Sequence, residues 1–426
     1  MIAYCAILGY LAALYLQPGI KFPALAPFRP LIVLGLLAMI SGTVYLMRRQ
    51  GRPLILGGQM KQMFIILAFM GLSGVFAYIK LTAYDAWFAF AKVVLFTVFL
   101  VNVVDSLPKF KGLLYALIVI HVGVGLEGLQ GFYTESDRAD RKGLKGTLSN
   151  FLGDTNDYSL AVNVIIPYAY FLGTAAQTRL ARWSLFGCVG LLTVASMFTF
   201  SRGGFLTLLV LSLHFVVKTR RRFGLMAIGV VLMVVVAAVV PQTYWDRIET
   251  IGSFQEDNNA QSRFWAWKAG WNMAVDNPLL GMGPGNFVTG YRVKYKPPEA
   301  RNRTLFTAHS VYFQIMGELG FVGLVLLIAL IISSFKAQRA ILAREPAEFG
   351  DPEDARFIRA AAHAAQASLL AFLVGGALLS AAYYPHLWFN AAFTLILTHI
   401  AKERAERVAP AAQTAELDMT PVYQRA

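Results

Sequence analysis

Long apolar stretches, separated by polar connections, run along most of this chain. Hydrophobic residues make up 57% of its 426 residues, and the mean hydropathy is +0.55. A soluble domain would need more polar sequence to cover so large an apolar volume. The stretches do not alternate as barrel strands do, and backbone groups inside lipid must pair within their own segment. The predicted fold class is therefore an all-α polytopic membrane protein.

Twelve stretches are long enough to be candidate membrane spans. They cover residues 2–16, 30–47, 62–79, 86–104, 112–129, 157–176, 183–200, 203–217, 223–240, 308–335, 362–382 and 386–401. The longest polar interruption, 241–307, separates the ninth span from the tenth.

The placement of basic residues predicts the orientation of the chain. A formal net charge of +14 could indicate nucleic acid binding, but lysines and arginines gather in connections between spans, such as 48–52 and 218–222. That is the positive-inside pattern of membrane proteins. We therefore expect membrane lipids as partners and no nucleic acid. An even number of spans places both termini in the cytoplasm and the long loops 130–156 and 241–307 on the far side.

This topology divides the chain into four parts. Residues 1–240 hold spans one to nine, with a far-side loop near 130–156. Residues 241–307 form a far-side loop with short interfacial helices, and 308–401 hold spans ten to twelve. Residues 402–426 have too few apolar side chains to fold alone, which predicts a cytoplasmic tail with a short amphipathic extension and then disorder.

Charged and aromatic residues converge between residues 241 and 323. The order is AQSRFWAWKAGW (260–271), DNPLLGMGPGNF (276–287), YRVKYKPPEARNR (291–303) and TAHSVYFQIMGELGFVG (307–323). Arginines, lysines and one histidine thus meet where a water-facing loop re-enters the membrane, which indicates a site for an anionic, lipid-borne substrate. The spacing G-x-G-x-G, with a proline inside and no strand before it, indicates a turn and not a phosphate cradle.

Two arginines are candidates for gripping phosphate. Arg263 lies beside Phe264, Trp267 and Trp271, whose spacing predicts one face of an interfacial helix, and a guanidinium binds phosphate in a bidentate way. An ordinary interfacial anchor is the alternative. Arg202 opens the eighth span in SRGGF, where a snorkelling arginine is the alternative to a phosphate site.

The remaining candidates are one histidine and a group of cations. His309 stands at the junction of loop and helix, where it could act as a base or be a capping or interfacial histidine. Neighbouring arginines would lower its pKa and keep it neutral. The group comprises Lys294, Lys296, Arg301 and Arg303. These four residues would recruit an acceptor or lipid headgroups, or would be only a solvated cationic loop.

Several chemistries have no motif in this sequence. There is no Asp-x-Asp for a metal-bound nucleotide sugar, no GxxxxGK[ST] and no HExxH. The two cysteines, Cys5 and Cys188, lie in apolar runs and form no metal knuckle. We therefore expect neither a cofactor nor a metal ion.

Five motifs between residues 146 and 323 carry a resemblance to a known family. They are GTLSNFLGDTNDYSLAVNVIIP, FTFSRGGFL, QSRFWAWKAG, NPLLGMGPGNF and AHSVYFQIMGELGFVG. In this order they resemble the bacterial O-antigen ligase and O-antigen polymerase family, class C type membrane glycosyltransferases. The resemblance implies a site on the periplasmic side of the inner membrane and a glycan donor linked to an undecaprenyl-type diphosphate. It also implies functional arginines at Arg202 and Arg263 and a functional histidine at His309.

The expected function is therefore metal-independent transfer of the glycan to a hydroxyl of the lipid A core oligosaccharide, in lipopolysaccharide assembly. His309 would be the base, and Arg263 would bind the departing diphosphate. Polymerisation of the glycan and transfer to protein are the enzymatic alternatives. A transporter of the lipid-linked glycan is the non-enzymatic one, but it would be expected to show internal repeats, and none is evident between the halves.

Overall fold

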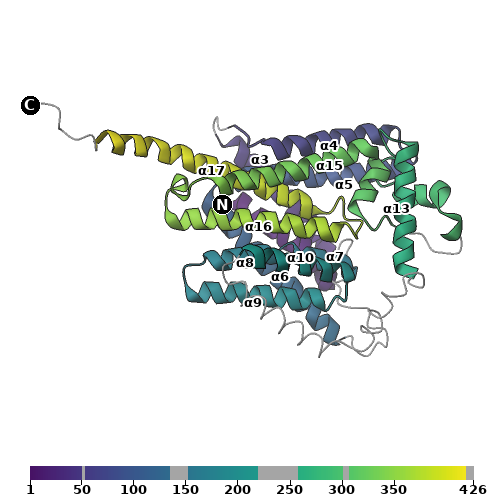
Figure 1. Cartoon of the computed structure of the whole chain (residues 1–426), viewed down its shortest axis with the longest axis horizontal. Coiled ribbons are helices and arrows are strands. Elements are labelled where there is room, and N and C mark those ends of the chain that lie inside the picture. The colour runs from purple at the N-terminus through teal and green to yellow at the C-terminus, as the bar shows by residue number, and fades with distance from the viewer. Residues whose placement is uncertain (50–52, 135–151, 219–257, 301–306, 419–426) are drawn as a thin grey trace, which may run out of the picture.

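Long helices lie side by side in a bundle, and one helix, α13 (Asn258–Asp276), crosses its end (Figure 1). The computed structural model describes residues 1–49, 53–134, 152–218, 258–300 and 307–418. Every regular element within those residues is helical, which confirms the predicted all-α class. The expected span 223–240 and most of the loop 130–156 lie outside the described residues.

The helices follow the apolar stretches of the sequence. The first half of the chain forms α1 (Ile2–Leu16), α2 (Pro18–Lys21), η1 (Pro23–Phe28), α3 (Pro30–Met47), α4 (Gly58–Val75), α5 (Lys80–Val103), α6 (Leu107–Thr134), α7 (Thr155–Asn163), α8 (Ile166–Ala175), α9 (Arg179–Met197) and α10 (Arg202–Lys218). After α13 come α14 (Phe287–Gly290), η2 (Tyr291–Tyr295), η3 (Pro298–Ala300), α15 (Val311–Ala343), η4 (Pro346–Phe349), α16 (Pro352–Gly376) and α17 (Pro385–Asp418).

Seven helical segments of the described residues are long and apolar enough to cross a membrane. They are Pro23–Met47, Lys80–Val103, Leu107–Phe132, Thr155–Ala175, Arg179–Met197, Val311–Ala343 and Pro352–Gly376. Large apolar side chains are exposed on the outside of the bundle, for example Leu36 at 53% and Leu213 at 64%, as lipid contact requires. The chain is thus a multi-pass membrane protein, while the total of twelve spans stays a prediction.

The end of the bundle opposite α13, here called the basic end, holds the start of α16 and the connection from α15 to α16, which the sequence predicts to be cytoplasmic (Figure 1). Asp354, near the start of α16, pairs with Lys111 of α6 at 2.8 Å and with Arg404 of α17 at 2.9 Å. The helices α16 and α17 extend well beyond the expected spans at this end. α16 begins at Pro352 because Asp351 accepts hydrogen bonds from the first backbone N–H groups. α17 continues through Ala401 to Asp418, so the expected tail begins as helix.

The regular helix of α15 is interrupted at Gly320, and the turn after α13 forms hydrogen bonds with the backbone groups that the interruption leaves unpaired. Gly320 has a φ of 67°, so the regular helical hydrogen bonds around it are lost. Met282 N donates to Gly317 O at 3.0 Å, and Gly283 N to Glu318 O at 2.9 Å. Phe321 N donates to the carbonyl of Pro278 at 2.9 Å. The glycine-rich segment is therefore a turn packed on α15, as the sequence predicted.

Gly281→Ala tests how tightly this turn is packed. A Cβ at Gly281, whose φ is +66°, would lie 2.4 Å from the carbonyl group of Glu318. The left-handed backbone and the clash should together destabilise the fold by about 2–4 kcal/mol and lower its Tm by several degrees. Thermal unfolding in detergent measures this. Gly187→Ala is the control because nothing lies within 4 Å of its added methyl group, and an equal Tm for both variants would contradict the packing.

Candidate active site

Two faces of α13 pack against other segments and hold this helix at the end of the bundle. Trp267 and Trp271 contact Phe313 and Phe321 of α15, with ring centroids 5.5 and 5.7 Å apart. The opposite face is buried in a second, smaller core formed by Ala266, Ala269, Met273, Met282, Phe287, Tyr291, Tyr295 and Ala308. The predicted aromatic face therefore lies against the start of α15, and Figure 1 shows α13 crosswise to the long helices.

The backbone of His309 is held by contacts with two other segments. Its N–H donates to Ser380 Oγ at 2.8 Å, and its carbonyl accepts from Trp267 Nε1 at 3.4 Å. Its φ of 46° lies in the left-handed region, which is uncommon for a histidine and which the surroundings must enforce. The fold thus sets the place of this residue through its backbone.

The imidazole of His309 is left available for chemistry. The N-cap of α15 is Ser310, so His309 does not cap the helix. The side chain is half-buried, and within the described part of the chain its ring nitrogens accept and donate no hydrogen bond. A ring with this exposure can exchange a proton with a bound molecule.

Burial and two charges set the protonation of His309. Burial lowers the pKa of the ring most, the positive charge of Arg263 lowers it further, and the carboxylate of Asp154 opposes both. Arg263 lies one helical turn before Trp267, on the same side of α13. The ring is therefore neutral near pH 7, the direction that the sequence predicted, although burial is the larger cause.

Asp154 connects this site to the start of α10. It caps α7 by accepting from Asn156 N at 2.8 Å, and Asn156 Oδ1 accepts from Ser201 Oγ at 2.6 Å. Ser201 Oγ in turn accepts from Gly204 N at 3.0 Å, which caps α10. Arg202 is the first residue of α10 and is exposed. The fold thus brings Arg202, Arg263 and His309 to the same end of the bundle.

The connection 377–384, between α16 and α17, contributes residues that the sequence reasoning missed. Ser380 accepts from the backbone of His309, and Tyr384 donates to Asp157 Oδ2 at 3.2 Å. The expected span 362–382 had placed Ser380 inside a helix, but α16 ends at Gly376. A signal was present in SAAYYPH, since the residue before a proline disfavours helix.

Glu318 of α15 was also missed, and it ties three segments together. Only 2% of this residue is exposed, and its carboxylate accepts from Tyr383 Oη at 2.6 Å and from Gly285 N at 2.8 Å. A buried carboxylate needs such partners. A lone glutamate inside the apolar run IMGELGF was the available signal, since ionisable residues in membrane helices have structural or functional partners.

Of the predicted cationic run, the structure describes Lys294 and Lys296. Lys294 pairs with Asp276, at the other end of α13, with 2.8 Å between Nζ and Oδ2. Both side chains are exposed, so the pair contributes about 0–1 kcal/mol. Asp276 lies about 20 Å along the helix from Arg263. Lys296 is half-buried, and Arg301 and Arg303 lie outside the described residues.

No three His, Cys, Asp or Glu side chains of the described residues lie together as a metal site would require. The polar groups that lie near His309 are the guanidinium of Arg263, the carboxylate of Asp154 and the hydroxyl of Ser380. Together they can accept a proton and bind an anion.

The chain matches a family model over part of its length. The model described as O-antigen ligase matches residues 187–328. The matched segment contains Arg202, Arg263 and His309, together with four of the five motifs that carried the resemblance. A search of curated proteins gave no match. Over residues 187–328 the chain is therefore similar to the O-antigen ligase family.

Proposed function

We propose that this protein transfers a glycan from a polyprenyl-diphosphate carrier to a hydroxyl of the lipid A core oligosaccharide, at the periplasmic face of the inner membrane. Members of the matched family are membrane enzymes of the glycosyltransferase type. The observation that carries the proposal is the available imidazole of His309, which lies under the influence of Arg263 and Asp154 at the entry of a membrane helix.

In the proposed reaction His309 takes the proton of the acceptor hydroxyl. The acceptor oxygen then forms a bond to the anomeric carbon of the glycan, while the bond from that carbon to the diphosphate oxygen breaks. The electron pair leaves with the polyprenyl diphosphate, and Arg263 and Arg202 stabilise its charge. Because a diphosphate is a good leaving group, the reaction needs no covalent glycosyl intermediate.

Asp154 has a supporting part in this proposal. Its carboxylate favours the protonated form of the His309 ring, whereas burial and Arg263 disfavour it. When the ring accepts a proton, Asp154 stabilises the imidazolium that forms, as a carboxylate does for the histidine of other acid–base sites. Asp154 is itself exposed, so the effect is moderated by water.

The test is reconstitution of purified protein in detergent with a polyprenyl-diphosphate glycan and core lipid A. The joined product, core plus glycan, is the expected result. A donor glycan that only grows longer would support the polymerase alternative, and a product formed only with an acceptor protein would support transfer to protein. No product with any acceptor would contradict the enzymatic proposal.

The proposed topology can be checked directly. Reporter fusions at Lys294, in the segment after α13, are expected to read periplasmic, and fusions at Glu353, at the start of α16, cytoplasmic. Paired fusions with reporters active on opposite sides control for expression. If the two reporters gave the opposite result, the proposed site would not face the periplasm.

Transfer is expected to survive a metal chelator, because fixed arginines would do what a divalent ion does in other transferases. The measurement is the transfer rate after dialysis against chelator, with a metal-dependent transferase treated in parallel. Loss of activity that a divalent ion restores would contradict this expectation.

A further inference from the structure

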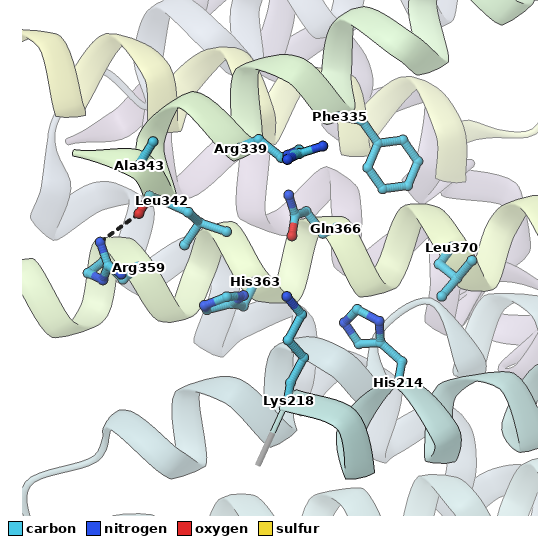
Figure 2. Close-up of a pocket in the computed structure, with 10 residues that line it drawn as sticks. All are labelled: His214, Lys218, Phe335, Arg339, Leu342, Ala343, Arg359, His363, Gln366 and Leu370. Carbon is cyan, nitrogen blue, oxygen red and sulfur yellow. Dashed lines mark hydrogen bonds between the residues drawn. The ribbon is translucent and has the colours of Figure 1, made fainter. Parts of the chain in front are cut away.

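A pocket of ≈ 590 Å³ opens at the basic end, between α10, α15 and α16 (Figure 2). It lies roughly 40 Å along α15 from the residues proposed for transfer. Its lining residues are His214, Lys218, Phe335, Arg339, Leu342, Ala343, Arg359, His363, Gln366 and Leu370. Its volume is within the range of small-molecule sites, and none of these lining residues is acidic.

Helical spacing explains why these side chains share one space. On α15, Phe335, Arg339 and Leu342 follow one another at intervals of four and three residues, and on α10 His214 and Lys218 are four apart. Such residues lie on one face of a helix. The lining residues of α16, from Arg359 to Leu370, have the same spacing. Three helices therefore each turn one continuous face toward the pocket.

Among the described residues, no acidic side chain neutralises the cations that line the pocket. Within the described part of the chain, neither Lys218 nor Arg339 makes a hydrogen bond or an ion pair. Arg359 donates to the carbonyl of Leu342 at 2.9 Å and to that of Arg344 at 3.0 Å, which holds it at the pocket wall without cancelling its charge. In Figure 2 Lys218 rises between His214 and His363, with Arg339 on the opposite wall. Three positive charges thus face one space.

Polar atoms in the pocket also lack partners. Among the described residues, the buried Nε2 of His214 and Nδ1 of His363 have no hydrogen-bond partner. Gln366, which is only 8% exposed, makes no hydrogen bond within the same part of the chain. Buried polar groups without partners are costly, so a ligand that offers several oxygen atoms would be stabilised here.

The lining of the pocket changes from charged to apolar along the helix axes. Lys218, Arg339 and Arg359 stand toward the outer end, whereas Phe335 and Leu370 lie nearer the middle of the membrane-crossing helices. A ligand that fits this order has a negative group at one end and an apolar part at the other. We propose that the pocket binds the phosphate of an anionic lipid headgroup, with the start of the acyl chains beside Phe335 and Leu370.

The test is a titration of purified protein in detergent with phosphatidylglycerol, read by native mass spectrometry. Phosphatidylcholine serves as the zwitterionic control, and glycerol 3-phosphate as the headgroup without chains. The double variant Lys218→Gln, Arg339→Gln is expected to bind phosphatidylglycerol about thirtyfold more weakly than the parent, since each basic side chain near the surface contributes about fivefold.

The matched control is the double variant Lys336→Gln, Arg356→Gln. It removes two exposed charges from α15 and α16 at the same end of the bundle, and neither residue lines the pocket. If both double variants bound phosphatidylglycerol equally weakly, the effect would be a general attraction between charges, and the proposed lipid site would be wrong. Glycerol 3-phosphate binding as tightly as the lipid would overturn the lipid as the ligand. Thermal unfolding of each variant confirms that it is folded, and no glycan donor is needed, so the result is independent of the proposed transfer.

Discussion

His309→Ala is expected to bind the lipid-linked donor almost normally and to transfer its glycan at least about 10²-fold more slowly, because a positioned base contributes about 10²–10⁴ to such rates. His309→Asn should behave in the same way. Asparagine tolerates the left-handed backbone found at this residue. The hydrogen bonds to the side chains of Ser380 and Trp267 use only the backbone N–H and carbonyl of residue 309, so both substitutions leave them in place. The fold should therefore survive both substitutions. The measurements are the rate of product formation and, separately, donor binding.

The control for His309 is His399→Ala, a half-buried histidine of α17 at the basic end, which should transfer at the parental rate. Near-normal transfer by a well-expressed His309→Asn protein would contradict the assignment of the base.

The parental enzyme should also lose activity as pH falls. The base must be neutral to accept a proton, and the pKa of His309 is lowered from 6.5 by burial and by Arg263. Activity should therefore be complete near pH 7 and decline only below about pH 6.5.

Arg263→Ala is expected to reduce transfer about 10²–10³-fold, the loss typical when one group that stabilises developing negative charge is removed. Lysine in its place should rescue only part of the rate, because an ammonium cannot bind phosphate in a bidentate way. Arg292→Ala is the matched control, since Arg292 is exposed in the segment after α13 and belongs to no part of the proposed site. Rates are compared at saturating and limiting donor to separate binding from chemistry.

The pH profile distinguishes a catalytic arginine from an anchor. Arg263 lowers the pKa of His309 by repulsion, so Arg263→Ala should move the acidic limb of the profile to higher pH. Arg263→Lys keeps the charge and should leave the limb near its original place. Full activity with an unchanged profile in the alanine variant would make Arg263 only an interfacial anchor.

The sequence predicted those features that local pattern determines. Apolar length predicted the helices, and aromatic spacing in FWAWKAGW predicted the face of α13 that now lies on Phe313 and Phe321. The loop-to-helix junction singled out His309. These features depend on residues close together in the chain, where helical geometry is a sufficient guide.

Local sequence patterns could not predict contacts between segments that are far apart in the chain. Asp154 and Ser380 reach His309 from segments that precede and follow it by many residues, and only the packed bundle brings them there. The ion pair between Lys294 and Asp276 is a further contact of this kind, because the two residues come together only where the chain folds back after α13. A role of Lys294 in recruiting a substrate stays a prediction.

The hydrogen bonds between the turn after α13 and the interrupted part of α15 restrict insertions and deletions in that turn. Surface loops usually tolerate insertions at small cost. Between Pro278 and Gly285, however, one added or deleted residue would shift the backbone N–H groups of Met282 and Gly283 away from the carbonyls of Gly317 and Glu318. Those carbonyls would then be left without partners inside a membrane helix. Homologous chains that share the glycine in α15 should therefore keep this turn at constant length, even where the neighbouring loop sequences grow or shrink.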